Sequence, residues 1–150
     1  MTEEELMRLA LVEAEKAKAE GEVPVGAVIA RDGEPLFTAH NRREARRDPT
    51  AHAEMDCLRG AAAALGDWRL RGCTLYVTLE PCPMCAGAMV MSQLDRVVFG
   101  AADPVRGCCG SVYDLPGDPA LQGRTAWKAG VLEAECRDML KDFFGELRNE

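Results

Sequence analysis

Two short stretches of the sequence carry side chains of the kinds that bind metals. Residues 50–55 read TAHAEM and contain His52, and residues 81–85 read PCPMC and contain Cys82 and Cys85. An imidazole and two thiolates are typical ligands of zinc. A structural zinc site needs four protein ligands, usually from two C-x-x-C pairs, and this chain has a single such pair. The three side chains therefore predict an open zinc site whose fourth position is left for water.

The two cysteines lie at the expected start of a helix that opens at Pro81 and runs to about Ser92. Cys82 and Cys85 are three residues apart, so they share one face of its first turn. The unpaired N–H groups and the dipole of a helix N-terminus favour the thiolate, which is the form that binds a metal. The expected helix start thus supports the metal assignment.

Glu54 lies two positions after His52, in a helix predicted from the N-cap Thr50 to a stop at Gly66. Side chains two apart in an ideal helix point about 200° apart, so this pair can share a site only over the N-terminal end. A carboxylate that lies near the metal without binding it can carry protons. An isolated H-x-E is usually a surface pair, and an isolated C-x-x-C can be a redox pair. The redox interpretation leaves the histidine and the glutamate without a role.

The rest of the pattern predicts helices and strands that alternate along the chain. Asp32-Gly33 between two apolar runs is typical of a hairpin, and Thr2 with Glu5 forms a capping-box pattern. The expected helices cover 2–20, 50–66, 81–92 and 133–148, and the expected strands lie within 22–41, 73–80, 95–101 and 127–132. Residues 103–125 are rich in glycine, proline and turn formers and predict a loop. The pattern favours an α/β sheet with helices on its faces, antiparallel at the hairpin and parallel later.

The composition indicates one domain. The chain has 150 residues, of which 47% are hydrophobic, so we expect a single domain over residues 1–150. The opening MTEEELMRLA is acidic and amphipathic, and no apolar run approaches the roughly 18 residues of a membrane span. We therefore expect a cytoplasmic protein with no membrane contact. Seven cysteines without a secretory signal favour reduced thiols or metal ligands over disulfides.

The net charge of −7 argues against a nonspecific nucleic-acid binder, whose affinity depends on lysines and arginines that neutralise phosphates. The exception is NRREARR, residues 41–47, which directly precedes the His52 helix. We expect Arg46 and Arg47 to contact phosphate there, although a charged loop of this kind can also be merely solvated.

Several other side chains have a structural interpretation. We expect Cys57, Cys73 and Cys136 to be buried and to pack as small hydrophobic side chains. Cys108-Cys109 beside glycines predicts loop packing rather than a second metal site. We expect at least one of Phe143 and Phe144 to lie in the core.

Together, the HAE of 52–54 and the PCPMC of 81–85 resemble the H-x-E and P-C-x-x-C signature of the zinc-dependent deaminases of the cytidine and deoxycytidylate deaminase superfamily. More narrowly, the chain resembles the bacterial tRNA-specific adenosine deaminases. The stretches that carry this likeness are EVPVGAV (22–28), DPTAHAEM (48–55), TLYVTLEPCPMCAGAM (74–89), RVVFGA (96–101) and DFF (142–144). The likeness spans nearly the whole chain and is most specific up to residue 101.

The resemblance implies a three-layer α/β/α cytidine-deaminase-like fold around a five-stranded mixed sheet. It also implies a homodimer with one zinc ion per subunit, held by His52, Cys82 and Cys85. The implied activity is that of a hydrolase acting on C–N bonds in a cyclic amidine, converting adenosine to inosine at wobble position 34 of a tRNA. The implied substrate is the anticodon stem-loop of an arginine tRNA. Zinc hydroxide would attack C6 of the flipped-out adenine, and Glu54 would shuttle the proton to N1 and help ammonia leave.

The same resemblance implies contacts with the substrate. Asn41 would hydrogen-bond the base, while Pro24, Val25 and Ala53 would line its pocket. Asp103 would meet the sugar–phosphate of a neighbouring nucleotide.

The chain departs from the family pattern in three places. Val105-Arg106 leaves open which position supplies the basic charge of that loop, LQGR (121–124) replaces an asparagine–histidine pair, and Gly145 stands where arginine is common. These positions concern RNA contacts, so they bear on the substrate more than on the chemistry. One alternative is a deaminase of a small free substrate such as guanine, cytosine or a nucleoside. Another is a noncatalytic zinc-stabilised subunit that delivers RNA to a partner, which would not need Glu54.

Overall fold

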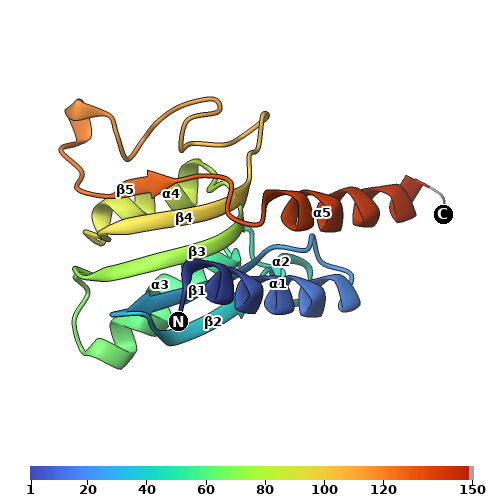
Figure 1. Ribbon diagram of the computed structural model, residues 1–150, viewed down its shortest axis with the longest axis horizontal. Coiled ribbons are helices and arrows are strands. Elements are labelled where there is room, and N and C mark those ends of the chain that lie inside the picture. Colours follow the sequence, from blue (N-terminus) through green and yellow to red (C-terminus); the bar gives the residue numbers. More distant parts are fainter. Residues whose placement is uncertain (149–150) are drawn as a thin grey trace.

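The computed structural model describes residues 1–148, in which a mixed β-sheet is covered by helices on both faces (Figure 1). In chain order the elements are α1 (Glu3–Ala19), β1 (Gly26–Arg31), β2 (Glu34–His40), α2 (Arg43–Arg46), α3 (Ala53–Leu65), β3 (Cys73–Leu79), α4 (Pro83–Met91), β4 (Arg96–Ala101), a 3-10 turn (Pro119–Leu121), β5 (Ala126–Lys128) and α5 (Glu133–Arg148). Thr2 and Glu5 form the predicted capping box at the start of α1.

The sheet has five strands in the order β2-β1-β3-β4-β5. Strand β1 is antiparallel to both β2 and β3, whereas β3, β4 and β5 run parallel to one another. Asp32 and Gly33 both have positive φ, of 52° and 76°, which is the geometry of a two-residue type I′ hairpin. The predicted hairpin and the change to parallel pairing are both confirmed.

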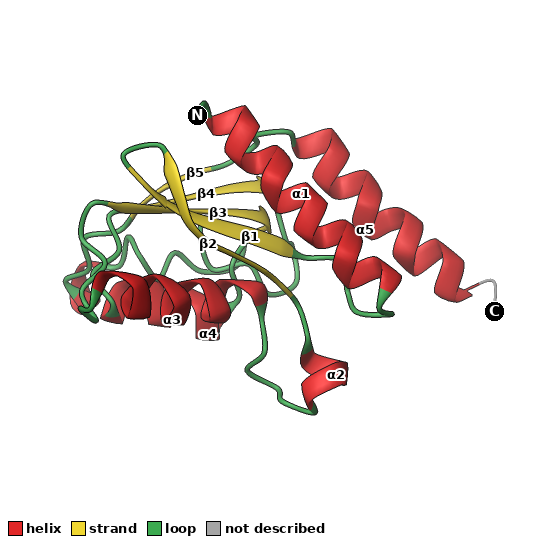
Figure 2. Cartoon of the chain, turned by 90° about the horizontal axis from the view of Figure 1, so that it is seen from below, coloured by secondary structure: helices red, strands yellow, loops and turns green. Residues whose placement is uncertain are grey.

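Helices form one layer on each face of the sheet (Figure 2). α1 and α5 cover one face, where Leu6, Met7, Val28 and Val98 belong to one buried cluster. α3 and α4 cover the other face over a larger cluster. The α/β/α arrangement expected from the resemblance is therefore confirmed.

Most of the cysteines are buried in the interior of the protein. Cys57, Cys73 and Cys136 are buried, as predicted. Cys108-Cys109 is also buried and packs with the core cluster under α3 and α4. The region from Asp103 to Thr125 contains only the 3-10 turn and an isolated bridge, which confirms the predicted loop.

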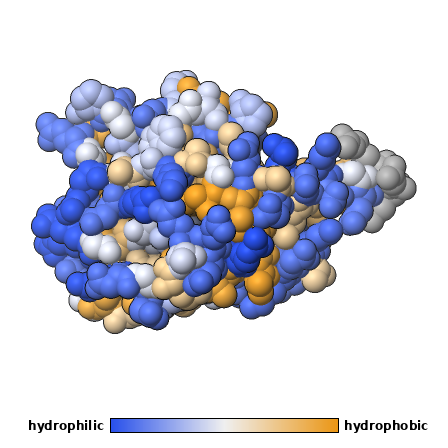
Figure 3. Space-filling view, viewed as in Figure 1, coloured by the Kyte–Doolittle hydropathy of each residue, from blue (hydrophilic) through white to orange (hydrophobic). Residues whose placement is uncertain are grey.

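Hydrophilic residues cover much of the surface over α1 and α5, and apolar residues gather near the centre of this face (Figure 3). Within residues 1–148, no helix combines the length and the hydropathy that crossing a membrane requires.

Candidate metal and substrate site

His52 occupies the N-cap of α3, so the predicted N-cap at Thr50 is wrong. The backbone N–H and the hydroxyl of Thr50 both donate to Asp48 Oδ1, at 2.8 and 2.7 Å, and its side chain is therefore taken. Asn41 caps the helix instead, because its Oδ1 accepts the N–H of Ala53 at 2.9 Å. The imidazole thus lies just outside the helix and over its N-terminal end.

Cys82 has the corresponding place in front of α4, which begins at Pro83 and not at Pro81 as predicted. A residue before proline is restricted to extended backbone, and Cys82 has φ −75° and ψ 174°. The proline that follows is well suited to the first helical position. Cys85 then lies inside the first turn, three residues after Cys82.

These two helix starts bring His52, Cys82 and Cys85 together. His52 Nδ1 lies 3.7 Å from the sulfur of Cys82 and 3.6 Å from that of Cys85, and the three ligand atoms all lie within 4.8 Å of one another. Ligands at typical Zn–N and Zn–S distances with a tetrahedral angle are separated by roughly 3.6 Å. The spacing and the donor types therefore fit one zinc ion.

The three ligands differ in how readily they lose the proton that a metal must displace. A hydrogen bond with the Cys85 thiol lowers the pKa of Cys82 to about 4, and the nearby imidazole adds to this against the effect of burial. The hydrogen bond with Cys82 and burial raise the pKa of Cys85 well above its usual range. The hydrogen bond with Cys82 also raises the pKa of His52. One thiolate is thus ready to bind, and the second sulfur loses its proton when the metal arrives.

Glu54 is the second residue of α3 and is only 3% exposed. Its Oε1 has no hydrogen-bond partner within residues 1–148. Burial raises the pKa of this carboxyl group to about 7, so the group can both release and accept a proton near neutral pH. A buried oxygen without a protein partner is free to form a hydrogen bond with a substrate or a water molecule.

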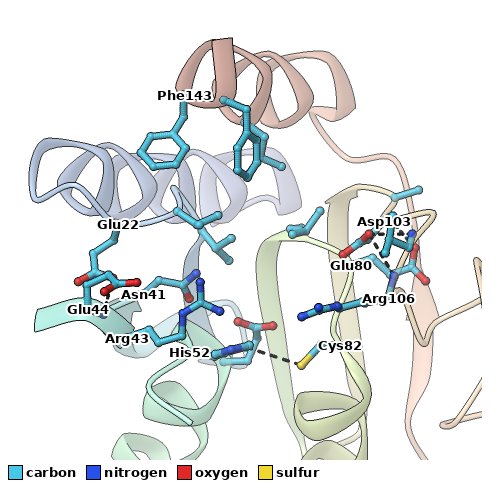
Figure 4. A pocket seen from close by; sticks show the side chains of 18 of the residues that line it. Glu22, Asn41, Arg43, Glu44, His52, Glu80, Cys82, Asp103, Arg106 and Phe143 are labelled. Carbon is cyan, nitrogen blue, oxygen red and sulfur yellow. Dashed lines mark hydrogen bonds between the residues drawn. The ribbon is translucent and has the colours of Figure 1, made fainter. Parts of the chain in front are cut away.

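A cavity of about 810 Å³ opens above these residues, within the range of roughly 300–1,000 Å³ common for small-molecule sites. Figure 4 shows His52 and Cys82 at its floor and Phe143 of α5 on the opposite side. Arg43 of α2 and Arg106 of the loop after β4 point into it from opposite walls. The cavity therefore has an arginine on each of two opposite walls, among a lining that also includes acidic side chains.

The sequence-predicted site residues fall into two groups. Those that line the cavity are Val25, Asn41, His52, Glu54, Cys82 and Asp103. Cys85 is buried beside them, and Pro24 and Ala53 are buried without lining the cavity. Arg46 and Arg47 also lie outside it. The guanidinium of Arg46 donates to both carboxylate oxygens of Asp56, at 3.0 and 2.9 Å.

The sequence did not single out several residues that line the cavity. Arg43 was only one of a cluster, and the spacing gave no sign that it alone would face inward. Arg106 lies in a loop whose course no periodic pattern predicts. Phe143 is 8% exposed, so the expectation of at least one core phenylalanine is confirmed, and both Phe143 and Phe144 line the cavity.

Known proteins are similar to this chain in sequence and in fold. Residues 1–101 match the family described as the cytidine and deoxycytidylate deaminase zinc-binding region. The tRNA-specific adenosine deaminase of Bacillus subtilis (strain 168) is 52% identical over 151 residues, covering 100% of this chain and 94% of that protein. A solved structure from studies of A-to-I editing by tRNA:A34 deaminases has a TM-score of 0.87 at 41% identity, covering 90% of this chain and 98% of that one. The guanine deaminase of Bacillus subtilis has a TM-score of 0.65 at 36% identity, over 68% of this chain and 66% of that one.

Proposed function

Because the chain belongs to the cytidine and deoxycytidylate deaminase family, we propose that it converts adenosine to inosine at the wobble position of a tRNA in a zinc-dependent hydrolysis. The convergence of His52, Cys82 and Cys85 beside the buried Glu54, at the floor of one cavity, carries this conclusion. The likeness to tRNA-specific adenosine deaminases over the full chain supports the substrate.

His52, Cys82 and Cys85 hold the metal in this proposal. A zinc ion bound there supplies Lewis acidity and a hydroxide nucleophile near neutral pH. Two of the three ligands sit at N-caps, where the backbone N–H groups of α3 and α4 stabilise negative charge. Cys85 is buried by the packing of the helices, whereas Cys82 lines the cavity.

Glu54 moves the protons. Its carboxylate takes a proton from the attacking water, gives it to N1 of the adenine and assists the departure of ammonia from C6. A pKa of about 7 suits a group that must do both in one cycle.

Asn41 orients the base. Its Oδ1 already accepts the Ala53 N–H, so its NH2 group is the part left to donate to the substrate. Val25 gives the base an apolar wall, which Pro24 and Ala53 support from behind. Asp103 lines the cavity near its rim, where the neighbouring sugar–phosphate would pass.

In this proposal, the part of the RNA that stays outside the cavity contacts Arg46 and Arg47. Arg46 and Arg47 lie in and directly after α2 and outside the cavity, where they would meet the phosphates of nucleotides that stay outside. An anticodon loop suits such a site because its bases are easily unstacked and turned outward. We assign residues 1–150 to one zinc-dependent deaminase domain that acts as a homodimer on an arginine tRNA in the cytoplasm.

Deamination of a free base is the second candidate, which the likeness to guanine deaminase favours. The zinc-loaded protein should be incubated separately with an anticodon stem-loop that carries adenosine at position 34 and with free guanine, cytosine and adenosine. We expect inosine in the stem-loop and no ammonia from the free compounds. Turnover of guanine with none of the RNA would replace the proposed substrate.

A further inference from the structure

The loop of residues 103–111 lines one wall of the cavity with its first four residues, which include Asp103 and Arg106. It has no regular secondary structure, yet its course decides where the guanidinium of Arg106 points (Figure 4). Glu80 lies beneath the loop and is only 2% exposed. It immediately precedes Pro81 and the metal ligand Cys82.

Both ends of the loop donate hydrogen bonds to the carboxylate of Glu80. Its Oε1 accepts the N–H of Asp103 at 3.0 Å and the hydroxyl of Ser111, and its Oε2 accepts the N–H groups of Cys109 and Ser111 at 2.9 and 3.1 Å. The carboxylate of Glu80 is therefore the centre around which the loop folds.

The same network continues to Arg106. Asp103 Oδ1 accepts the N–H groups of Val105 and Arg106, at 3.0 and 3.2 Å. Gly107 then passes so close to the carboxyl group of Glu80 that a Cβ at this position would overlap it. The backbone on both sides of Arg106 is thus held by contacts that begin at Glu80.

We propose that Glu80 is a positioning residue, which shapes the 103–111 loop so that Arg106 meets a phosphate of the substrate at the cavity wall. The proposal rests on the proposed function for the identity of the substrate. It also assigns the basic charge of this loop to Arg106 and links that contact to the segment carrying Cys82. A guanidinium suits the task because it offers several N–H donors and a permanent charge to a phosphate.

Glu80→Gln tests the proposal. The amide keeps the size of the side chain but has one accepting oxygen, so two of the four donors would face an NH2 group. We expect KM for the stem-loop to rise about tenfold with little change in kcat, since the lost contact binds substrate away from the reacting atoms. Zinc content should stay the same, and the amide protons of Asp103, Cys109 and Ser111 should exchange faster.

Glu13→Gln is the matched control. Glu13 is another buried carboxylate and accepts hydrogen bonds from Lys16 and Thr38, but it lies on α1 outside the cavity. Its loss should lower stability without changing KM or the exchange of the 103–111 loop. If Glu80→Gln behaved in the same way as this control, Glu80 would be a structural residue only and the proposal would be overturned.

A double-mutant cycle with Arg106→Ala shows whether Glu80 acts through the arginine. We expect Glu80→Gln to add little to KM when Arg106 is already absent; full additivity would contradict the proposal. If Glu80→Gln does not fold, Ser111→Ala removes one donor and should give the same changes to a smaller extent, and no change would overturn the proposal. Loop exchange is measured without substrate, so it stays informative even if the wild-type protein fails to deaminate RNA.

Discussion

The role of Glu54 depends on where its side chain is held. It is buried beside the metal ligands, and its Oε1 has no partner within residues 1–148. The sequence singled out this glutamate and the three ligands because each of their motifs is short and local, and the structure brings the four residues together. It did not predict Arg106, because a side chain in an irregular loop is aimed by distant contacts, here those of Glu80.

Glu54→Gln should abolish turnover while leaving the metal site intact. The amide has nearly the same shape but cannot carry the proton, and proton transfer of this kind contributes about 10²–10⁴ in rate. We expect kcat on the stem-loop to fall by at least about 100-fold at unchanged zinc content, measured by inosine formation and elemental analysis. Glu15→Gln, on the exposed side of α1, serves as the control and should keep full activity. Normal turnover by Glu54→Gln would exclude Glu54 as the proton carrier and favour a noncatalytic role for this residue.

For the elements that carry the site, the sequence predicted the type, helix or strand, more accurately than the residues at which each begins and ends. Both ligand-bearing helices exist, but each begins two residues later than expected. Asp48 removes Thr50 from the capping role, and the proline at position 83 forces Cys82 out of the helix. The hydrophobic pattern of the sequence also gave no sign that α1 packs closely on β1. It depends on Gly26, where a Cβ would overlap the carbonyl oxygen of Ala10 and the amide nitrogen of Ala14.

Gly26→Ala should therefore destabilise the fold by pushing α1 away from the sheet. Overpacking of this kind typically costs about 1–3 kcal/mol, and backbone atoms on the other side leave little room to adjust. Denaturant unfolding of the two proteins gives the difference in the free energy of unfolding. Gly145→Ala in α5 is the matched control, since a Cβ there meets nothing within 4 Å and alanine favours a helix by up to about 1 kcal/mol. Equal stability of Gly26→Ala and wild type would show that α1 does not pack on β1 as described.

The molecule as a whole combines an acidic surface with a cavity that has arginines on opposite walls. The alternation of helices and strands predicted the α/β class, and the resemblance supplied the number of strands and the three layers. The strand order and the pairing of α1 with α5 on one face depend on contacts between segments far apart in the sequence, which periodicity does not encode. The metal site depends on the same long-range packing, because His52 and Cys82 are the N-caps of helices that follow different strands.

Zinc stoichiometry measured together with RNA deamination decides whether this packing creates the site. We expect one zinc per chain by elemental analysis, loss of inosine formation in step with zinc removal by a chelator, and recovery when zinc is restored. His52→Ala and Cys82→Ala should each lower both zinc content and activity. A preparation that contains no zinc or other transition metal and still deaminates the stem-loop at the full rate would contradict the account.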